Sequence, residues 1–459
     1  MQELADLTAV ELVTAYREGT LSPVEVTEDV LARIEARESE LHALYAYDPA
    51  GAREDAKASE ARWQAGEPQG PIDGVPLTLK ENIATRGTPV PYGTAATELV
   101  PAPADAPAAA RVRESGGVVL AKTTMPDYGM LTSGLSSFHT ASRNPWDPSR
   151  TPGGSSAGAG AAAAAGYGPL HVGTDIGGSI RLPAGWCGLA GLKPSFGRVP
   201  VDPPFLGRVA GPMTRTVADA ALLMSVLSAP DARDHLCLPP ADLDWSTVDA
   251  SVRGLRVGLH LDPGTGLAVE PEIIAAVTEA ARLFEAAGAV VEPVAAFMTR
   301  EMLDGLDRFW RVRSWSDMTA LPAERRAKVL PYIAEWAEGG AEVSGVDTYR
   351  AFAQMDAVSV AALRATAPFD LVLSPTCPVS PPPTEWASPT NDPLRALEHI
   401  AFTVPYNMSG QPSLAVNCGY TSGGLPIGLQ ITGPRFADVA VLRAGAAFER
   451  LRPAQHPWP

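Results

Sequence analysis

A serine that could act as a nucleophile lies in the segment GTDIGGSIRLP, residues 173–183. The glycines ahead of it allow a tight backbone path that exposes consecutive N–H groups, and such groups can stabilise the oxyanion formed when a carbonyl is attacked. Ser179 is therefore a candidate nucleophile, and the amides of Ile176, Gly177, Gly178 and Ser179 are a candidate oxyanion hole. Taken alone, the segment is explained equally well as a structural glycine-rich turn.

A second glycine-rich segment, TPGGSSAGAGAAAAAG, begins at Thr151. It lacks the Gly-Lys-Ser/Thr ending of a phosphate-binding loop, and a dinucleotide-binding turn would need a strand directly before it. The preceding residues, RNPWDPSR, favour turns instead. We therefore expect this segment to join Ser179 in one site rather than to bind a nucleotide.

The base that would activate Ser179 is not evident among the histidines. The nearest one in sequence, His171, is isolated, and an isolated histidine has many structural uses. A lysine can serve when it is neutral: at the ordinary pKa of about 10.4 only about 0.04% is neutral at pH 7, but burial lowers that pKa strongly. Lys80 ends the apolar segment IDGVPLTLK, where solvent would be excluded, and is the candidate base. The alternative is that its side chain reaches the surface.

The elements that position these residues alternate between helices and strands. Residues 1–65 are predicted to be helical, because Thr8 with Glu11 and Ser22 with Glu25 form capping-box patterns. Further along, the patterns predict strands in GVPLTLKENIA, GGVVLAKTT, RGLRVGLHL and FDLVLSPTCP, helices in ALLMSVL and ITGPRFADVAVLRAGAAFERL, and a hairpin-like pair of strands in PYNMSGQPSLAVNCGYTSGGLPIGLQITG. This alternation predicts an α/β fold with a largely parallel or mixed sheet. We expect one large domain, residues 1–459, with a loop at 228–254 and an inserted helical segment at 265–365 that shapes the substrate pocket.

The amino-acid composition and the net charge argue against several classes of function. Of the 459 residues, 46% are hydrophobic and 19% charged, as in an ordinary globular protein. The net charge of −16 argues against nucleic acid and anionic membranes as partners. Four cysteines without a C-x-x-C pair indicate free thiols rather than a zinc, redox or disulfide framework. Neither a signal-peptide pattern nor a bilayer-spanning apolar run is present, so we expect a cytoplasmic protein.

Several motifs, in the same order along the chain, resemble the amidase signature family. They are GVPLTLKENI, the segment GGSSAGAGAAAAAG followed by GTDIGGSIRLPAGWCGLAGLKPSFGRVP, and the later blocks GPMTRTVADAALLM, FTVPYNMSGQPSLAV and GLPIGLQITGP. The resemblance covers nearly the whole chain. It implies a single large domain with a twisted mixed β-sheet covered by helices on both faces.

The resemblance also implies roles for the candidate residues. The family uses a Ser–cis-Ser–Lys triad, which makes Ser179 the nucleophile, Ser155 the bridging serine after a cis peptide bond, and Lys80 the base. The separation of the two serines agrees with the family's. Lys80 would take a proton from Ser155 as Ser155 takes one from Ser179, a lysine version of nucleophile-and-base catalysis.

Other residues receive supporting roles from the same resemblance. Ser156 is expected to stabilise the loop, and Asp175 and Arg181 to brace it, since buried charges are usually paired. The backbone carbonyl of Gly129 is expected to accept the amide hydrogen of the substrate. One departure is Glu81, where the family usually has aspartate.

The segment VAGPMTR, residues 209–215, is a second departure. Glutamine-dependent tRNA amidotransferase subunits usually carry an aspartate upstream of its glycine-proline. The predicted function is therefore a stand-alone hydrolase of carboxylic amides that works through an acyl-enzyme, with carbamates and esters as further substrates. The alternatives are an ammonia-generating subunit of a complex and a non-enzymatic binding or scaffold protein. No metal or cofactor is implied, and a homodimer is left open.

The prediction about substrate preference is based on a cluster of aromatic residues at 309–336. It contains Phe309, Trp310, Trp315, Tyr332 and Trp336. An amphipathic helix that packs its aromatics into the core is one interpretation. The other is an aromatic wall over the substrate, formed by Trp310 and Trp315, that favours bulky aromatic groups.

Overall fold

The computed structural model describes residues 3–246 and 250–459. In these residues, eleven strands form one continuous sheet with the order β1-β3-β2-β4-β6-β5-β10-β11-β9-β7-β8. The strands are β1 Leu44–Tyr45, β2 Pro76–Lys80, β3 Val118–Thr123, β4 Leu170–Asp175, β5 Ala190–Lys193, β6 Val209–Thr214, β7 Arg256–Leu259, β8 Val290–Pro293, β9 Leu371–Pro375, β10 Ser413–Tyr420 and β11 Pro426–Thr432.

The sheet is mixed. Strands β3, β2 and β4 run parallel, as do β9, β7 and β8, whereas β1 and the central strands pair antiparallel. The predicted pair of strands near the C-terminus is the antiparallel pair β10–β11. A single domain with a mixed sheet between helices is therefore confirmed.

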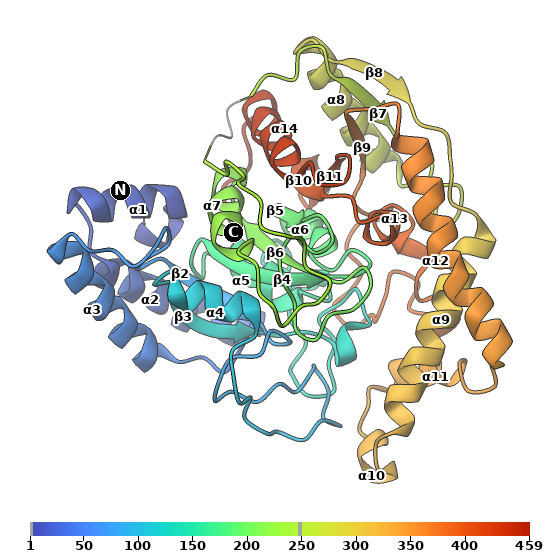
Figure 1. The fold of residues 1–459 in the computed structure, drawn as a ribbon, viewed down its shortest axis with the longest axis horizontal. Helices are drawn as coiled ribbons and strands as arrows, with labels where there is room; N and C mark the ends of the chain where they lie inside the picture. The colour runs from blue at the N-terminus through green and yellow to red at the C-terminus, as the bar shows by residue number, and fades with distance from the viewer. Residues whose placement is uncertain (1–2, 247–249) are drawn as a thin grey trace.

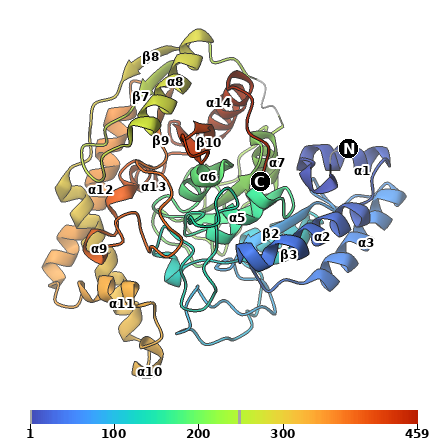
Figure 2. The ribbon, with the colours of Figure 1, turned by 180° about the vertical axis from the view of Figure 1, so that it is seen from behind.

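Fourteen α-helices surround the sheet in the described residues. They are α1 Ala9–Glu18, α2 Pro23–Leu41, α3 Pro49–Ala65, α4 Pro107–Glu114, α5 Ala157–Ala165, α6 Arg181–Cys187, α7 Val217–Leu227, α8 Pro271–Ala286, α9 Arg300–Thr319, α10 Ala323–Arg326, α11 Pro331–Glu338, α12 Gly345–Thr366, α13 Val404–Met408 and α14 Asp438–Leu451. Helices α1–α3 and α9–α12 lie at opposite ends of the molecule in both views (Figures 1 and 2). Both predicted capping boxes are present, at the starts of α1 and α2.

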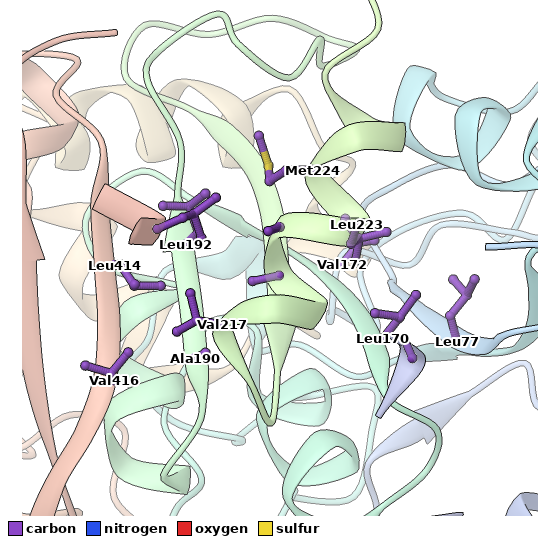
Figure 3. Close-up of a cluster of buried hydrophobic side chains, with 14 of the residues drawn as sticks. Leu77, Leu170, Val172, Ala190, Leu192, Val217, Leu223, Met224, Leu414 and Val416 are labelled. Carbon is purple, nitrogen blue, oxygen red and sulfur yellow. The ribbon is translucent and has the colours of Figure 1, made fainter. Parts of the chain in front are cut away.

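Alternation along the strands explains why helices cover both faces. Leu414 and Val416 belong to the large core cluster that also holds Val217 of α7, whereas Ala415 between them packs with α5 and α6. Figure 3 shows side chains of the first face, from β2, β4, β5 and β10, gathered against α7. Helix α5 is buried on every side and consists of alanine and glycine, so it fits closely against the sheet.

The same alternation directs Lys80 away from that first face. Leu77 and Leu79 belong to the cluster around α7, so Thr78 and Lys80 project to the opposite face of β2, where α5 and α6 lie. One face of this five-residue strand is therefore apolar, and the other carries Thr78 and the candidate base Lys80.

Two ranges differ in detail from the prediction. Residues 1–65 also hold the short strand β1, which pairs with β3. Residues 265–365 hold α8–α12 but also β8, which joins the sheet beside β7. Residues 228–254 contain no helix or strand in their described part, and 247–249 lie outside the described residues.

Two further observations bear on the class of protein. Across residues 3–246 and 250–459, no helix is long and apolar enough to cross a bilayer. In the same residues the four cysteines are free thiols, as predicted.

Candidate active site

Three segments deliver the candidate triad to one edge of the sheet. Lys80 is the last residue of β2, Ser155 lies just before α5, and Ser179 lies between β4 and α6. Strands β2 and β4 are parallel neighbours, so their carboxyl ends meet at the same edge. Side chains that are far apart in sequence are thereby brought onto one cavity, which Ser155 and Ser179 both line.

Lys80 is fully buried, with 0% of its surface exposed. Its Nζ donates hydrogen bonds to Ser155 Oγ at 2.8 Å and to Thr174 Oγ1 at 3.1 Å. Burial lowers the pKa of Lys80 to about 7, and this outweighs the opposing effect of Asp175. A large fraction of the amine is therefore neutral near pH 7 and able to accept a proton.

Ser155 sits between Lys80 and the backbone of Gly129. The Gly154–Ser155 peptide bond is cis, as the resemblance implied. Gly129 has φ +70°, and a Cβ added there would lie 3.1 Å from Ser155 Oγ. The backbone expected to contact the substrate thus runs directly beside the expected bridging hydroxyl.

Ser156 joins the two serine loops. Its N–H donates to the carbonyl oxygen of Ser179 at 3.2 Å, and its Oγ donates to the carbonyl oxygen of Thr174 at 3.2 Å. Ser179 is half-buried, whereas Ser155 and Lys80 are buried. Of the three candidates, Ser179 is thus the one most open to a molecule in the cavity.

The segment from Ile176 to Ser179 offers fewer free amides than the sequence suggested. The N–H of Gly178 donates to Asp175 Oδ1 at 2.8 Å, so this amide is engaged. In the described residues, the amides of Ile176, Gly177 and Ser179 have no hydrogen-bond acceptor. Three of the four expected donors are free to meet an oxyanion.

A buried ion pair holds this segment in place. Arg181 Nη2 lies 3.0 Å from Asp175 Oδ1, and both side chains have 0% exposure. Burial alone would raise the pKa of Asp175, but the charge of Arg181 and the hydrogen bonds from Ile180 and Asn407 hold it well below its ordinary value. The other guanidinium hydrogens reach acceptors in distant segments, at Thr403, Asn407 and Gln430. The pair therefore fixes the loop to the core.

His171 is absent from this cavity. It is buried, with Nδ1 2.8 Å from Thr78 Oγ1 and Nε2 2.9 Å from the carbonyl oxygen of Gly168. Burial lowers the pKa of His171 to about 3, so it is a neutral structural group.

The chain is similar to known proteins along nearly its whole length. The family model described as Amidase matches residues 25–442. The chain belongs to the amidase signature family.

Relatives of this amidase include both hydrolases and amidotransferase subunits. It is 36% identical to a glutamyl-tRNA(Gln) amidotransferase subunit of Myxococcus xanthus, over 98% of each chain, and 34% identical to an acylamidase of Rhodococcus erythropolis, over 98% of this chain and 97% of that one. The structure of a bacterial aryl acylamidase of the amidase signature family matches with a TM-score of 0.89 at 33% identity, over 97% of this chain and 96% of the other. The chain is thus an amide-hydrolysing enzyme of this family, and the scaffold alternative is set aside.

The aromatic cluster of the amidase divides between the cavity and the core. Trp310 lines a cavity together with Ser179, and its ring would lie 3.1 Å from a Cβ added to Gly177. Trp315 is half-buried on the same helix and is not among the residues that line either cavity at Ser179. Trp336 is buried and donates from Nε1 to Asp307.

The site also holds residues that the sequence analysis did not identify. Thr174 binds Lys80 and Asn82, and Arg208 and Arg313 line the cavity of the two serines. Thr174 lies within the segment of Ser179, residues 173–183, and could have been identified there. The arginines come from unrelated segments, and only the folded chain brings them together. At the departure Glu81, the carboxylate binds His139 and the N–H of Gly93.

Proposed function

We propose that this amidase hydrolyses small carboxylic amides without a partner protein, through an acyl-enzyme on Ser179, with Ser155 and Lys80 relaying the proton. The observation that carries the proposal is the contact of 2.8 Å between the buried Lys80 Nζ and Ser155 Oγ. A buried amine with a pKa of about 7 that is bound to a serine hydroxyl is the arrangement a Ser–Lys mechanism needs.

Acylation begins when Ser179 Oγ attacks the carbonyl carbon of the substrate. The hydroxyl proton of Ser179 passes to Ser155 Oγ, whose own proton passes to the neutral Lys80 Nζ. Because no hydrogen bond joins the two serine hydroxyls among the described contacts, Ser179 must approach Ser155 as it reacts. The amides of Ile176, Gly177 and Ser179 stabilise the oxyanion.

Collapse of the tetrahedral intermediate breaks the C–N bond. Ser155 returns a proton to the departing amine and recovers one from Lys80, which leaves a Ser179 ester and a neutral lysine. Water then attacks the ester carbonyl with the same relay, and the carboxylic acid is released. Carbamates and esters present a carbonyl to the same groups, so we include them among the substrates.

The alternative of an amidotransferase component predicts a different dependence on partners. It is kept because amidotransferase subunits are among the relatives. The purified chain should release ammonia or an amine from simple amides when assayed alone. Activity that appears only after a partner protein is added would favour the amidotransferase alternative.

A neutral fluorophosphonate tests the nucleophile directly. Peptide mapping should find the label on Ser179, and Ser179→Ala should abolish labelling. Ser149→Ala is a matched control, because Ser149 is exposed to solvent at its loop and binds Asp147. A label on Ser155 or Ser156 would overturn the assigned roles.

A further inference from the structure

Two arginines line the cavity that holds Ser155 and Ser179. Arg208 precedes β6 and Arg313 lies on α9, and both are half-buried. Their guanidinium carbons lie 5.7 Å and 4.8 Å from the centre of the Phe205 ring. Two positive charges from distant segments therefore converge beside the catalytic serines.

Within the part of the chain that the structure describes, neither arginine has a carboxylate in ion-pair contact. In the described residues, the hydrogen bonds of Arg208 and Arg313 go to the carbonyl oxygen of Pro203 at 3.2 Å and to Met130 Sδ at 3.4 Å. No described acidic side chain lies within ion-pair distance of either guanidinium. By contrast, Arg181 and Arg311 each form a salt bridge with an aspartate.

The charged and titratable groups around the pair leave it positive. Asp317 lies one turn after Arg313 on α9 but is exposed, and Tyr92 near Arg208 is exposed as well. Asp175 also lines the cavity, but Arg181 holds it. Asp317 offsets part of the two positive charges, but no described carboxylate forms an ion pair with either guanidinium.

The arrangement is unfavourable without an anion. Burial and the charge of Arg208 together lower the pKa of Arg313 to about 10, against the opposing effect of Asp317. Both groups nevertheless stay charged at pH 7, so partly desolvated like charges face each other. Contact with the Phe205 ring offsets part of this cost. A bound anion would offset the remaining electrostatic cost of placing the two positive charges together.

Two adjoining cavities meet at Ser179. The cavity shared with Ser155 is polar and is lined by both arginines. Arg313 also lines the adjoining cavity, whose other side chains are mainly apolar, among them Leu131, Leu182, Trp310, Leu397 and Ile400. The polar cavity has a volume of about 40 Å³. One water needs about 10–15 Å³ on this scale, so a group the size of a carboxylate fits there.

We propose that the substrate is an anionic amide, whose carboxylate is bound by Arg208 and Arg313 on one side of the scissile bond while an apolar group occupies the side of Trp310. This proposal rests on the proposed function and adds the class of substrate to it. Arginine suits the task because its planar donors match a carboxylate in bidentate geometry.

Pairs of substrates in which a neutral methyl ketone replaces a carboxylate of similar size test the proposal. Succinamate and its neutral isostere 4-oxopentanamide carry the test group on the acyl side, and N-acetylglycine and N-(2-oxopropyl)acetamide carry it on the amine side. We expect the wild-type enzyme to favour the anion of at least one pair in kcat/KM by about tenfold or more, the size of a charge-assisted hydrogen bond. The pair that shows the preference identifies the side on which the carboxylate lies.

Variants assign the preference to the arginines. In Arg208→Gln and Arg313→Gln the preference should fall toward unity through a higher KM for the anion, and Arg313→Lys should restore part of it. Arg308→Gln is the matched control, because Arg308 is exposed on the same helix and outside both cavities. It should keep the wild-type preference. Melting temperatures identify any variant that has not folded.

A protection assay covers substrates that turn over slowly. Succinate and N-acetylglycine should slow the labelling of wild-type Ser179 by a neutral fluorophosphonate, and the neutral isosteres should not. The proposal is overturned if the anions neither react faster nor protect, or if both glutamine variants keep the wild-type preference. Absence of labelling at Ser179 would instead refute the proposed function, so the two failures are distinguishable.

Discussion

Replacing Lys80 by methionine should stabilise the fold at acidic pH while it abolishes catalysis. Burial moves the pKa of Lys80 from 10.5 to about 7. At about 1.4 kcal/mol per unit, the folded state disfavours the charged lysine by about 5 kcal/mol. Methionine removes this cost and also two hydrogen bonds, which are worth about 1 kcal/mol each.

The sign of the pH dependence follows from proton binding. Between the folded pKa near 7 and the unfolded value of 10.5, the unfolded chain holds a proton on Lys80 that the folded chain lacks, so wild-type stability rises with pH in this window. Below pH 7 both states are protonated and the whole cost is present. Lys80→Met should thus be more stable than wild type by about 3 kcal/mol at pH 6 and about equal to it at pH 9.

Denaturant unfolding of both proteins at pH 6, 7.5 and 9 measures this difference. The wild-type kcat/KM for a neutral amide should rise with pH through a midpoint near 7, since the neutral amine of Lys80 is the proposed base, and the variant should lose nearly all activity. Lys122→Met is the control, because Lys122 is also buried with a pKa lowered to about 7 but binds Thr85 and the carbonyl of Ile83 instead of the serines. It should show a similar stability trend and remain active. A stability difference for Lys80→Met that stays constant from pH 6 to 9, or near-normal turnover by that variant, would refute the reasoning.

Four further substitutions test the loop and the pocket. Gly178→Ala should lower the melting temperature and the activity together, because φ is +129° and the new Cβ would lie 2.7 Å from neighbouring side-chain atoms. Asp175→Asn leaves the Arg181 charge buried without its partner, so denaturant unfolding should show a loss of about 3–5 kcal/mol. Trp310→Ala should change the ranking of anilides against short aliphatic amides, whereas Trp315→Ala should keep the wild-type ranking; an unchanged ranking in Trp310→Ala would give that residue a purely structural role.

The elements of the fold were largely predictable because their signals are local. Capping boxes fix the starts of α1 and α2, and the apolar alternation in β2 both marks a strand and buries Lys80. Strand β1 has two residues, too few for a pattern, and it forms because β3 offers it a partner. The pairing of β8 with β7 likewise depends on contacts across the sheet rather than on sequence spacing.

The candidate site was predictable where motifs are contiguous and unpredictable where the fold assembles it. Ser179 and Lys80 stand out from their own segments, whereas Ser155 was identified through the family resemblance. The engagement of the Gly178 amide could not be foreseen, because it depends on how Arg181 orients Asp175. The unpaired arginines carry no local signal, since an arginine without an acidic partner is recognised only when all its neighbours are known.

The complete burial of Lys80 behind Ser155 has a consequence for the kind of bond that the proposed mechanism can break. In the proposed mechanism, the proton taken from Ser179 passes inward, away from this half-buried residue and toward a lysine with no solvent-exposed surface. Buffer cannot collect it there, so it stays in the site until the C–N bond breaks. Ammonia and alkylamines are poor leaving groups as anions and depart readily only when protonated. A buried lysine that keeps the proton until the amine departs suits the hydrolysis of unactivated amides. An activated ester has a better leaving group and does not need that proton.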